Sequence, residues 1–239
     1  MKQHIVMPTK LNVRANSGKD EANTILGVLP KRTIVEEIDA LSDRSWLKIK
    51  SGNLTGWVSN DFLLPSYDAK TAPWLDFAYN EFGVAEIAGD DKSNSRIEQY
   101  HHSITAGSVS GKDDVAWCSS FTNWCVENTG IKTQPTITRS ARSWAKFGAK
   151  TTTPGIGSIV VFWRRPSKKE SAEQSGWTKE KLMKSGSYGH VGFFVEMLDN
   201  RVIVYGGNQS SSMNPSGEVC KKAYPIDSEN YGVVTFIKL

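Results

Sequence analysis

Halfway along the chain the sequence reads Val115-Ala116-Trp117-Cys118-Ser119-Ser120-Phe121-Thr122-Asn123-Trp124-Cys125. Its apolar spacing predicts a helix that begins near Cys118 and runs to Thr129, with Gly130 as its C-terminal stop. A cysteine at a helix N-terminus meets unpaired backbone N–H groups and the positive end of the helix dipole, which both stabilise a thiolate. Cys118 is therefore a candidate nucleophile, whereas Cys125, two turns further along, is better explained as an inert core thiol.

The segments on either side of this helix change in type along the chain. Further helices are predicted at residues 73–82, 95–101 and 140–147, and strands at 158–163, 190–195, 201–205 and 233–238. Pro73 suits the first position of a helix, and Gly83 and Gly148 suit helix ends. Helices followed by antiparallel strands are typical of an α+β domain with its helices packed on one side of the sheet, papain-like in outline.

A histidine, His190, opens one of the predicted strands. A turn at Asp199-Asn200 then leads into a return strand that ends in Gly206-Gly207-Asn208-Gln209. With a tight turn, Gln209 falls opposite His190. With a one-residue bulge, for which the two glycines are suited, or with a three-residue loop centred on Asp199, Asn208 falls opposite it instead.

The residue opposite His190 matters because directly opposed residues share a face of the sheet. An asparagine there can accept a hydrogen bond from one ring nitrogen and leave the other aimed at the sulfur of Cys118, as the third member of a catalytic triad does. Glu196 and Asp199 are rivals for this role, but both lie near the far end of the hairpin.

The first quarter of the chain has the pattern of a small all-β domain. Short β-branched segments at 25–29, 33–38, 46–50 and 55–58 alternate with turn-forming residues, and a spacing of roughly ten residues suits a barrel or compact sandwich. Residues 65–72 are polar and bounded by prolines, which is typical of a linker. The predicted domains are therefore 1–64 and 73–239, and Trp57 is predicted to be a core aromatic of the first.

These motifs resemble two bacterial families. Leu11-Asn12-Val13-Arg14, Trp46-Leu47-Lys48-Ile49 and Gly56-Trp57-Val58-Ser59 resemble the bacterial SH3-type domain, a small β-barrel that commonly binds the cell wall. Trp117-Cys118, Gly157-Ser158-Ile159-Val160-Val161-Phe162, Gly189-His190-Val191-Gly192-Phe193 and Gly206-Gly207-Asn208-Gln209-Ser210 resemble the CHAP family of cysteine, histidine-dependent amidohydrolases and peptidases. The second likeness spans about residues 72–238.

The resemblance implies a peptidoglycan amidase or endopeptidase with a Cys-His-Asn thiol mechanism. By position, Cys118 is the expected nucleophile, His190 the general base and Asn208 the orienting group. We expect Trp117, Gly189 and Gln209 to contact the substrate. The expected partner is peptidoglycan, bound by a monomer that acts as a phage lysin or as a secreted antibacterial effector, in which case an immunity protein is a further expected partner.

Two other function classes remain open. A thiol protease or deamidase toxin would use the same chemistry on a protein, and a non-catalytic wall-binding protein would keep only the fold. Residues 164–189 hold seven Lys/Arg against three acids, an excess that equals the net charge of +4 for the whole chain. This segment is predicted to be a solvated loop or a flap that meets an anionic substrate, and no nucleic-acid motif accompanies it.

Composition excludes several other classes. Hydrophobic residues make up 38% and charged residues 23% of the chain, as in ordinary globular proteins. The N-terminus lacks the apolar run of a signal peptide and no segment reaches the roughly 20 apolar residues of a membrane span. We therefore expect synthesis in the cytoplasm, no membrane insertion, and action in the periplasm or cell wall of a target or host bacterium. No cofactor is expected, because Asp113-Asp114 offers too few ligands for calcium and there is no zinc spacing.

Overall fold

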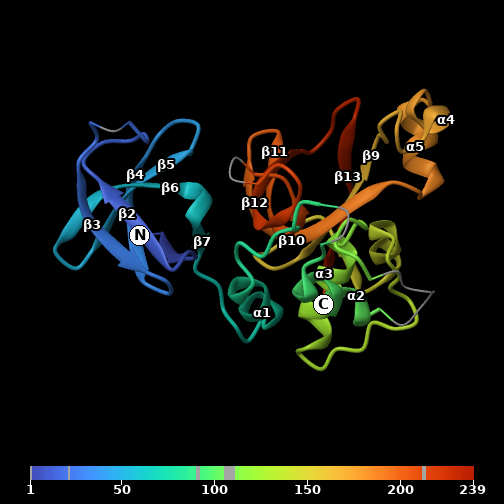
Figure 1. Cartoon of the computed structure of the whole chain (residues 1–239), viewed down its shortest axis with the longest axis horizontal. Helices are drawn as coiled ribbons and strands as arrows, with labels where there is room; N and C mark the ends of the chain where they lie inside the picture. The colour runs from blue at the N-terminus through green and yellow to red at the C-terminus, as the bar shows by residue number, and fades with distance from the viewer. Residues whose placement is uncertain (1, 21, 90–91, 105–110, 212–213) are drawn as a thin grey trace. The chain divides into compact units, whose positions relative to one another are not determined.

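The computed structural model of the chain describes residues 2–20, 22–89, 92–104, 111–211 and 214–239. Backbone contacts divide the chain into two compact units, Met1–Asp68 and Ala69–Leu239, and each unit has its own sheet (Figure 1). The division lies within the segment predicted as a linker. The second unit contains both helices and an antiparallel sheet, so the predicted α+β class is confirmed. No described helix is long and apolar enough to cross a membrane.

The first unit is an antiparallel sheet of seven strands in the order β3-β2-β6-β5-β4-β1-β7. Its elements are β1 (Gln3–Val6), β2 (Lys10–Arg14), β3 (Ile25–Pro30), β4 (Ile34–Ala40), β5 (Trp46–Ser51), β6 (Leu54–Ser59), the 3₁₀ helix η1 (Asn60–Phe62) and β7 (Leu63–Pro65). Strands β3 and β7 lie at opposite ends of this order. The predicted SH3-like β-barrel is therefore present as a loose barrel whose sheet is not closed.

Alternation of apolar and polar residues builds the core of the first unit. In β2, Leu11 and Val13 are buried while Lys10 and Asn12 are exposed, as a strand with one solvated face requires. Trp57 of β6 is only partly buried, because its neighbour Val58 takes the inward position. The prediction that Trp57 is a core aromatic is therefore wrong.

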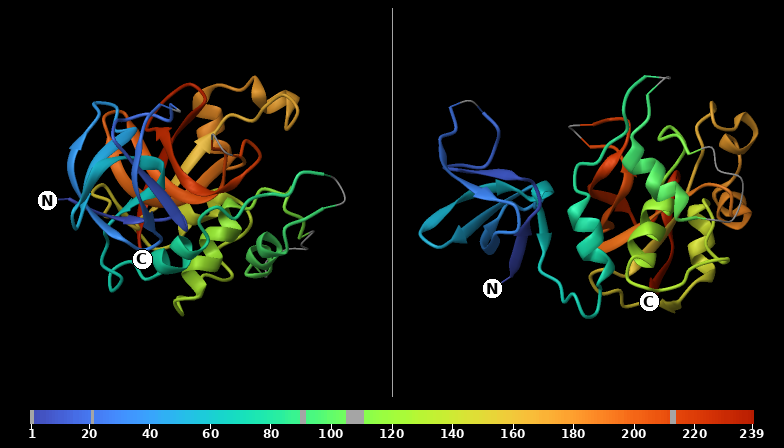
Figure 2. Two further views of the ribbon diagram at one scale, coloured as in Figure 1. Left: turned by 60° about the vertical axis from the view of Figure 1, so that its left-hand side comes forward. Right: turned by 60° about the horizontal axis from the view of Figure 1, so that its bottom comes forward.

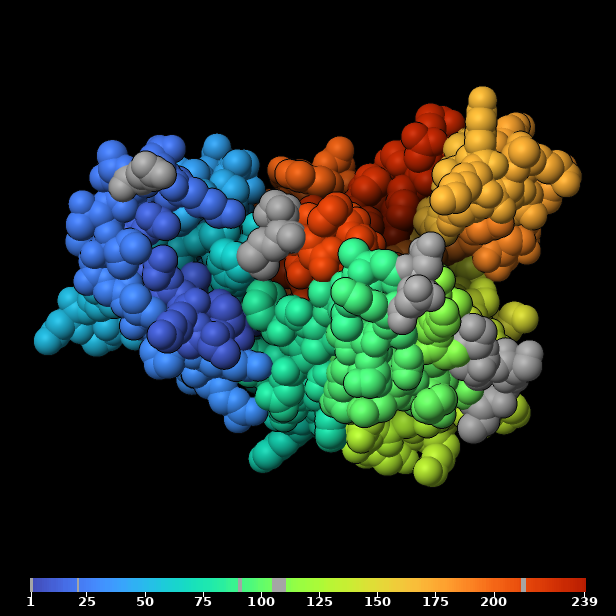
Figure 3. Space-filling model, in the orientation of Figure 1, coloured from blue at the N-terminus to red at the C-terminus, as the bar shows by residue number. Residues whose placement is uncertain are grey.

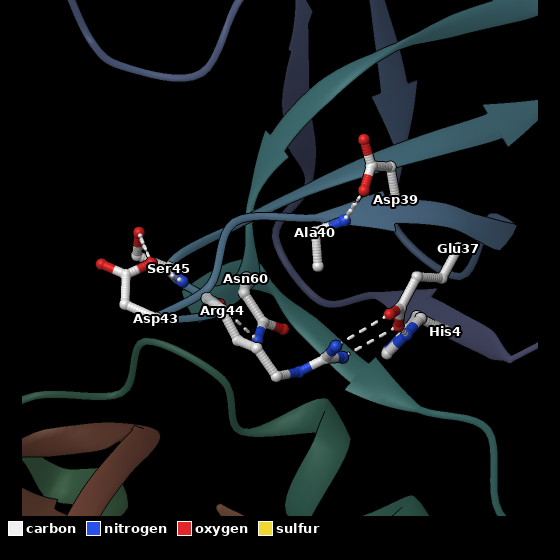
Figure 4. A network of polar contacts seen from close by, with 8 residues as sticks. All are labelled: His4, Glu37, Asp39, Ala40, Asp43, Arg44, Ser45 and Asn60. Carbon is white, nitrogen blue, oxygen red and sulfur yellow. Dashed lines mark hydrogen bonds and ion pairs between the residues drawn. The ribbon is translucent and has the colours of Figure 1, made fainter.

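A partly buried polar network ties β1 and β4 to the β4–β5 turn (Figure 4). Glu37 accepts hydrogen bonds from Arg44 Nη1 and Nη2, both at 2.9 Å, and its Oε2 lies 2.7 Å from His4 Nε2. Burial raises the pKa of Glu37, but the hydrogen bonds from Arg44 and His4 outweigh it and lower that pKa to about 2. The Glu37 carboxylate therefore stays ionised and holds β1 against β4 down to acidic pH.

The second unit has a six-stranded antiparallel sheet in the order β12-β11-β10-β9-β13-β8. Its strands are β8 (Ala149–Thr151), β9 (Ile159–Arg164), β10 (Gly189–Leu198), β11 (Arg201–Gln209), β12 (Glu218–Pro225) and β13 (Tyr231–Lys238). Its helices are α1 (Trp74–Asn80), α2 (Ser95–His102), α3 (Cys118–Glu127), the 3₁₀ helix η2 (Ala141–Lys146), α4 (Ala172–Ser175) and α5 (Lys179–Ser185). Figure 2 shows α1, α2 and α3 together on one side of the sheet.

Helix α3 lies at the centre of this unit because it packs against α1 and α2 on one side and against β10 and β11 on the other. Its apolar contacts include an edge-to-face pair between Phe121 and Phe193 of β10, with ring centroids 6.4 Å apart. The predicted start of this helix at Cys118 is confirmed. The helix predicted at 140–147 is confirmed in place but is the 3₁₀ helix η2.

The basic segment between β9 and β10 is folded. Residues 165–188, here called the helical insertion, contain α4 and α5, whose first turns are capped by the side chains of Ser171 and Thr178. Leu182 of α5 is buried, and Arg165 Nη1 donates to the carbonyl oxygens of Ser175 and Trp177. Most of the segment is exposed to solvent, as predicted, but it is partly helical and not a plain loop. In Figure 3 the insertion forms a lobe at the edge of the second unit.

Candidate active site

Cys118 is the first residue of α3, and its residue surface is 6% exposed, whereas Cys125 in the same helix is fully buried. The backbone N–H groups of Val191, Ser119 and Cys118 itself lie at the sulfur and favour its thiolate form. All three cysteines of the chain are free thiols. Cys118 is thus the cysteine whose sulfur meets backbone donors at a helix N-terminus, which is the environment that a nucleophile needs.

The ladder between β10 and β11 shifts register between Phe194 and Glu196 and ends at Phe193↔Tyr205, although the two strands stay close as far as Val191 and Gly206. The N–H of Val191 lies beyond this ladder, at the sulfur of Cys118. The start of α3 packs closely against β11: a Cβ on Gly207 would lie 2.3 Å from the Trp117 ring. Glycine at position 207 therefore lets β11 pass beside the residue that precedes Cys118.

His190 lies in β10 opposite Phe162 of β9, next to the residue whose N–H meets the sulfur. Its Nε2 lies 3.1 Å from Gln209 Oε1. The Gln209 amide nitrogen donates to the carbonyl oxygens of Gly206, at 3.1 Å, and Cys220. These two bonds fix the amide, so its oxygen must accept from His190 Nε2–H. Nδ1 is then the ring nitrogen that Gln209 does not bind.

The predicted contact between Asn208 and His190 is wrong. When its amide oxygen faces the available donors, Asn208 accepts hydrogen bonds from Trp117 N at 2.9 Å and Trp117 Nε1 at 3.2 Å. The shift at Phe194/Glu196 alone would set Asn208 opposite His190. A second shift, between Gly206 and Gln209, and a left-handed backbone at Asn208 with φ of 57° turn its side chain toward α3. Gln209 therefore takes the predicted orienting position.

The three residues predicted to contact substrate all lie beside Cys118 or His190, but they are largely covered in the free protein. Trp117 is fully buried and its indole N–H lies 2.9 Å from Glu86 Oε1, while Gln209 is 1% exposed. Gly189 is covered by the side chain of Arg142, whose Cδ lies 2.8 Å from the position of a Cβ. Trp117 and Gln209 thus support Cys118 and His190, and their contact with substrate stays a prediction.

Aromatic rings and cations surround His190 on the other side. The ring of Tyr224, in β12, lies 5.1 Å from that of His190 and is itself stacked on Tyr231 at 4.9 Å. The guanidinium of Arg164 lies near the Cys118 sulfur and forms a two-bond ion pair with Glu170 of the helical insertion. Arg164 and Tyr224 are not predicted as site residues from the sequence, because neither β12 nor the pairing of Arg164 with the insertion is a local signal.

Burial controls the protonation of both reacting groups. It raises the pKa of Cys118, outweighing the N–H groups of Val191 and Ser119 and the charge of Arg164. It also lowers the pKa of His190 to about 4, aided by the charges of Lys222 and Arg164 and opposed by the Gln209 hydrogen bond. The expected preformed thiolate is therefore not the resting state. Both shifts favour the neutral forms, the thiol of Cys118 and the imidazole of His190.

This protonation state predicts the pH profile. Because the neutral imidazole is the base and its pKa is about 4, kcat/KM should fall only as the pH drops through about 4. Replacing Lys222 by Gln removes a nearby positive charge, so the acid limb should move to higher pH. Initial rates between pH 3 and 8 measure both. An acid limb near the ordinary histidine value of about 6.5 in both proteins would contradict the assignment of His190 as a buried base.

Acidic residues ahead of Cys118 have a structural role. Asp113 is buried, and its Oδ2 accepts hydrogen bonds from Ile87 N at 2.9 Å and Asn94 N at 2.8 Å. Among the described residues, no group of three or more His, Cys, Asp or Glu side chains is placed to hold a metal ion. The geometry gives Asp113 the task of ordering the loop before α2.

Residues 110–208 match the model of the CHAP domain, and residues 9–63 match that of the bacterial SH3 domain. The chain combines a bacterial SH3 domain with a CHAP domain. The CHAP match contains Cys118, His190 and Asn208 and ends one residue before Gln209. A CHAP domain places the chain among the cysteine peptidases and amidases. The free thiol of Cys118 next to β10, the strand that carries His190, agrees with this family.

No curated protein matches the sequence. Among solved structures, NlpC2 from Trichomonas vaginalis is similar at 16% identity and a TM-score of 0.36, with 100% of this chain and 72% of that chain covered. An NlpC/P60 family protein from Bacillus cereus is similar at 13% identity and a TM-score of 0.31, with coverage of 97% and 62%.

Proposed function

We propose that this chain is a peptidoglycan hydrolase that cleaves an amide bond of the wall peptide, as an amidase or endopeptidase. The observation that carries the proposal is the placement of the Cys118 sulfur at the Val191 N–H, next to His190, whose Nε2 is fixed by Gln209. The bacterial SH3 domain supports a wall substrate, because such domains commonly bind peptidoglycan. This activity would serve either a phage lysin or a secreted antibacterial effector.

The reaction follows acyl transfer through a thioester. As the Cys118 sulfur attacks the amide carbonyl, its proton passes to His190 Nδ1, and the backbone N–H of Cys118 stabilises the developing oxyanion. In another acyl-transfer enzyme, the loss of one oxyanion-hole donor costs about 2.7–4 kcal/mol of transition-state stabilisation. His190 then gives the proton to the leaving amine, and a water molecule, deprotonated by His190, hydrolyses the thioester. Arg164 stabilises the thiolate as it forms.

Digestion of purified sacculi separates this proposal from its alternatives. We expect the full chain to clear sacculi cast in a gel, and prior treatment with iodoacetamide to abolish clearing with the label on Cys118. The label is located by peptide mapping, because Cys118 is 6% exposed, Cys220 4% and Cys125 0%. Binding to sacculi without clearing would mean a non-catalytic wall-binding protein. Clearing that survives full alkylation of Cys118 would reject the thiol mechanism.

A further inference from the structure

Lys222, in β12, lies on the same side of the site as His190. Its Nζ lies 5.7 Å from the centroid of the Tyr224 ring, and that ring lies 5.1 Å from the ring of His190. Both side chains share a face of the sheet, because Lys222 and Tyr224 are two positions apart on one strand. The Nζ also donates to the hydroxyl of Ser210, which directly follows Gln209, the residue bound to His190. Two contacts therefore hold the ammonium near the histidine.

No carboxylate of the described residues forms an ion pair with Lys222. The ammonium has three N–H donors, and its contacts are the Ser210 hydroxyl and the face of the Tyr224 ring. The residue is partly exposed, so a ligand can approach it from solvent. Arg164, the other cation whose charge acts on His190, is by contrast bound by both oxygens of Glu170. Lys222 is thus the cation of this pair that lacks an anionic partner within the described chain.

The charge of Lys222 opposes the proposed reaction unless an anion offsets it. Lys222 and Arg164 both lower the pKa of His190. Both therefore disfavour the imidazolium that forms when His190 takes the proton of Cys118. Glu170 offsets the charge of Arg164, and an anionic group of the substrate at Lys222 would do the same for the second cation. The electrostatics of the site thus favour a substrate that brings a negative charge to Lys222.

Resting on the proposed function, we infer that Lys222 binds a free carboxylate of the wall peptide on the His190 side of the site. An ammonium is a compact charge with rotatable donors, so it accepts a carboxylate oxygen without the fixed fork that a guanidinium requires. The Ser210 hydroxyl and the Tyr224 ring hold the ammonium in place while the carboxylate bonds to the remaining donors. Lys222 is then a specificity-determining residue, which favours a stem peptide with a free acid over one with an amide at the same position.

The test uses a set of synthetic stem peptides in which each free carboxylate in turn is replaced by a carboxamide. Binding is measured by calorimetry with the full chain carrying Cys118→Ala, which leaves the peptides uncut. We expect one of the replacements to lower the affinity by about tenfold or more, as the loss of a charge-assisted hydrogen bond does. When Lys222→Met is added, the same replacement should make little difference. Methionine removes the charge but keeps an unbranched side chain beside Tyr224.

Lys221→Gln is the matched control, because it removes a charge from the adjacent position of β12, whose side chain points to the opposite face. It should leave the preference for the free acid unchanged. A preference that survives Lys222→Met, or that Lys221→Gln also removes, would overturn the inference, and Lys222→Gln takes the place of Lys222→Met if the latter does not fold. Equal binding of all the peptides by the Cys118→Ala protein rejects only the carboxylate site. Failure of every peptide to bind rejects the wall-peptide substrate and with it the proposed function.

Discussion

Cys118→Ala should lower the rate of amide cleavage in sacculi by at least about 10³-fold, because no other group replaces the nucleophile of a catalytic triad. The sulfur is the single atom at which the N–H groups of Val191, Ser119 and Cys118 converge. Binding to sacculi should persist, since the SH3 domain is unchanged. Turbidity loss measures cleavage, and co-sedimentation measures binding.

A matched control is available in the same helix. Cys125→Ala removes a fully buried thiol from α3, so it should lower thermal stability modestly and leave the cleavage rate within a few-fold of the parent. If Cys125→Ala abolishes cleavage while Cys118→Ala retains it, the assignment of the nucleophile is wrong.

Gln209→Leu should reduce kcat by about 100-fold, less than the roughly 10⁴-fold that a misplaced triad tautomer can cost. The substitution keeps the shape of the side chain but removes the acceptor for His190 Nε2–H and the donors to Gly206 O and Cys220 O. His190 then loses the bond that directs Nδ1 toward sulfur. Single-turnover rates on a soluble stem peptide measure this loss apart from wall binding.

Two further variants distinguish orientation from general damage to the fold. Gln209→Glu keeps an acceptor and adds a negative charge, which stabilises the imidazolium and should move the acid limb of kcat/KM to higher pH than about 4. Asn208→Ala removes the bonds to Trp117 and should cost less activity than Gln209→Leu. A larger loss for Asn208→Ala, with no shift of the acid limb for Gln209→Glu, would restore Asn208 as the orienting residue.

The difference between Asn208 and Gln209 shows where sequence reasoning reached its limit. The pattern around Cys118 predicted the helix start, because apolar spacing and the glycine stop are local signals. The partner of His190 depends on a register count across a hairpin of about twenty residues, and each bulge moves that count by one. One shift occurs in the β10–β11 pairing, at Phe194/Glu196, and a second irregularity lies in β11 itself, at Gly206/Gln209, where its pairing with β12 shifts. A single bulge was considered, and it pointed to the wrong neighbour.

Long-range burial was also beyond the reach of the sequence. The helix dipole at Cys118 is a local feature, but the rings and strands that bury the sulfur come from distant segments such as Tyr224 and Tyr231. Their effect reverses the expected direction of the thiol pKa. The helical insertion was missed for a related reason: α5 buries only Leu182, so it lacks the apolar face by which a surface helix is recognised.

The central claim is that Cys118 and His190 together cleave an amide bond of peptidoglycan. Its most direct test is end-group analysis of digested sacculi, with new amino groups and new sugar reducing ends counted in parallel. The account predicts that the full chain releases new amino groups, that reducing ends stay at the level of untreated sacculi, and that Cys118→Ala releases neither. New reducing ends without new amino groups, or new amino groups that persist in the Cys118→Ala protein, would contradict it.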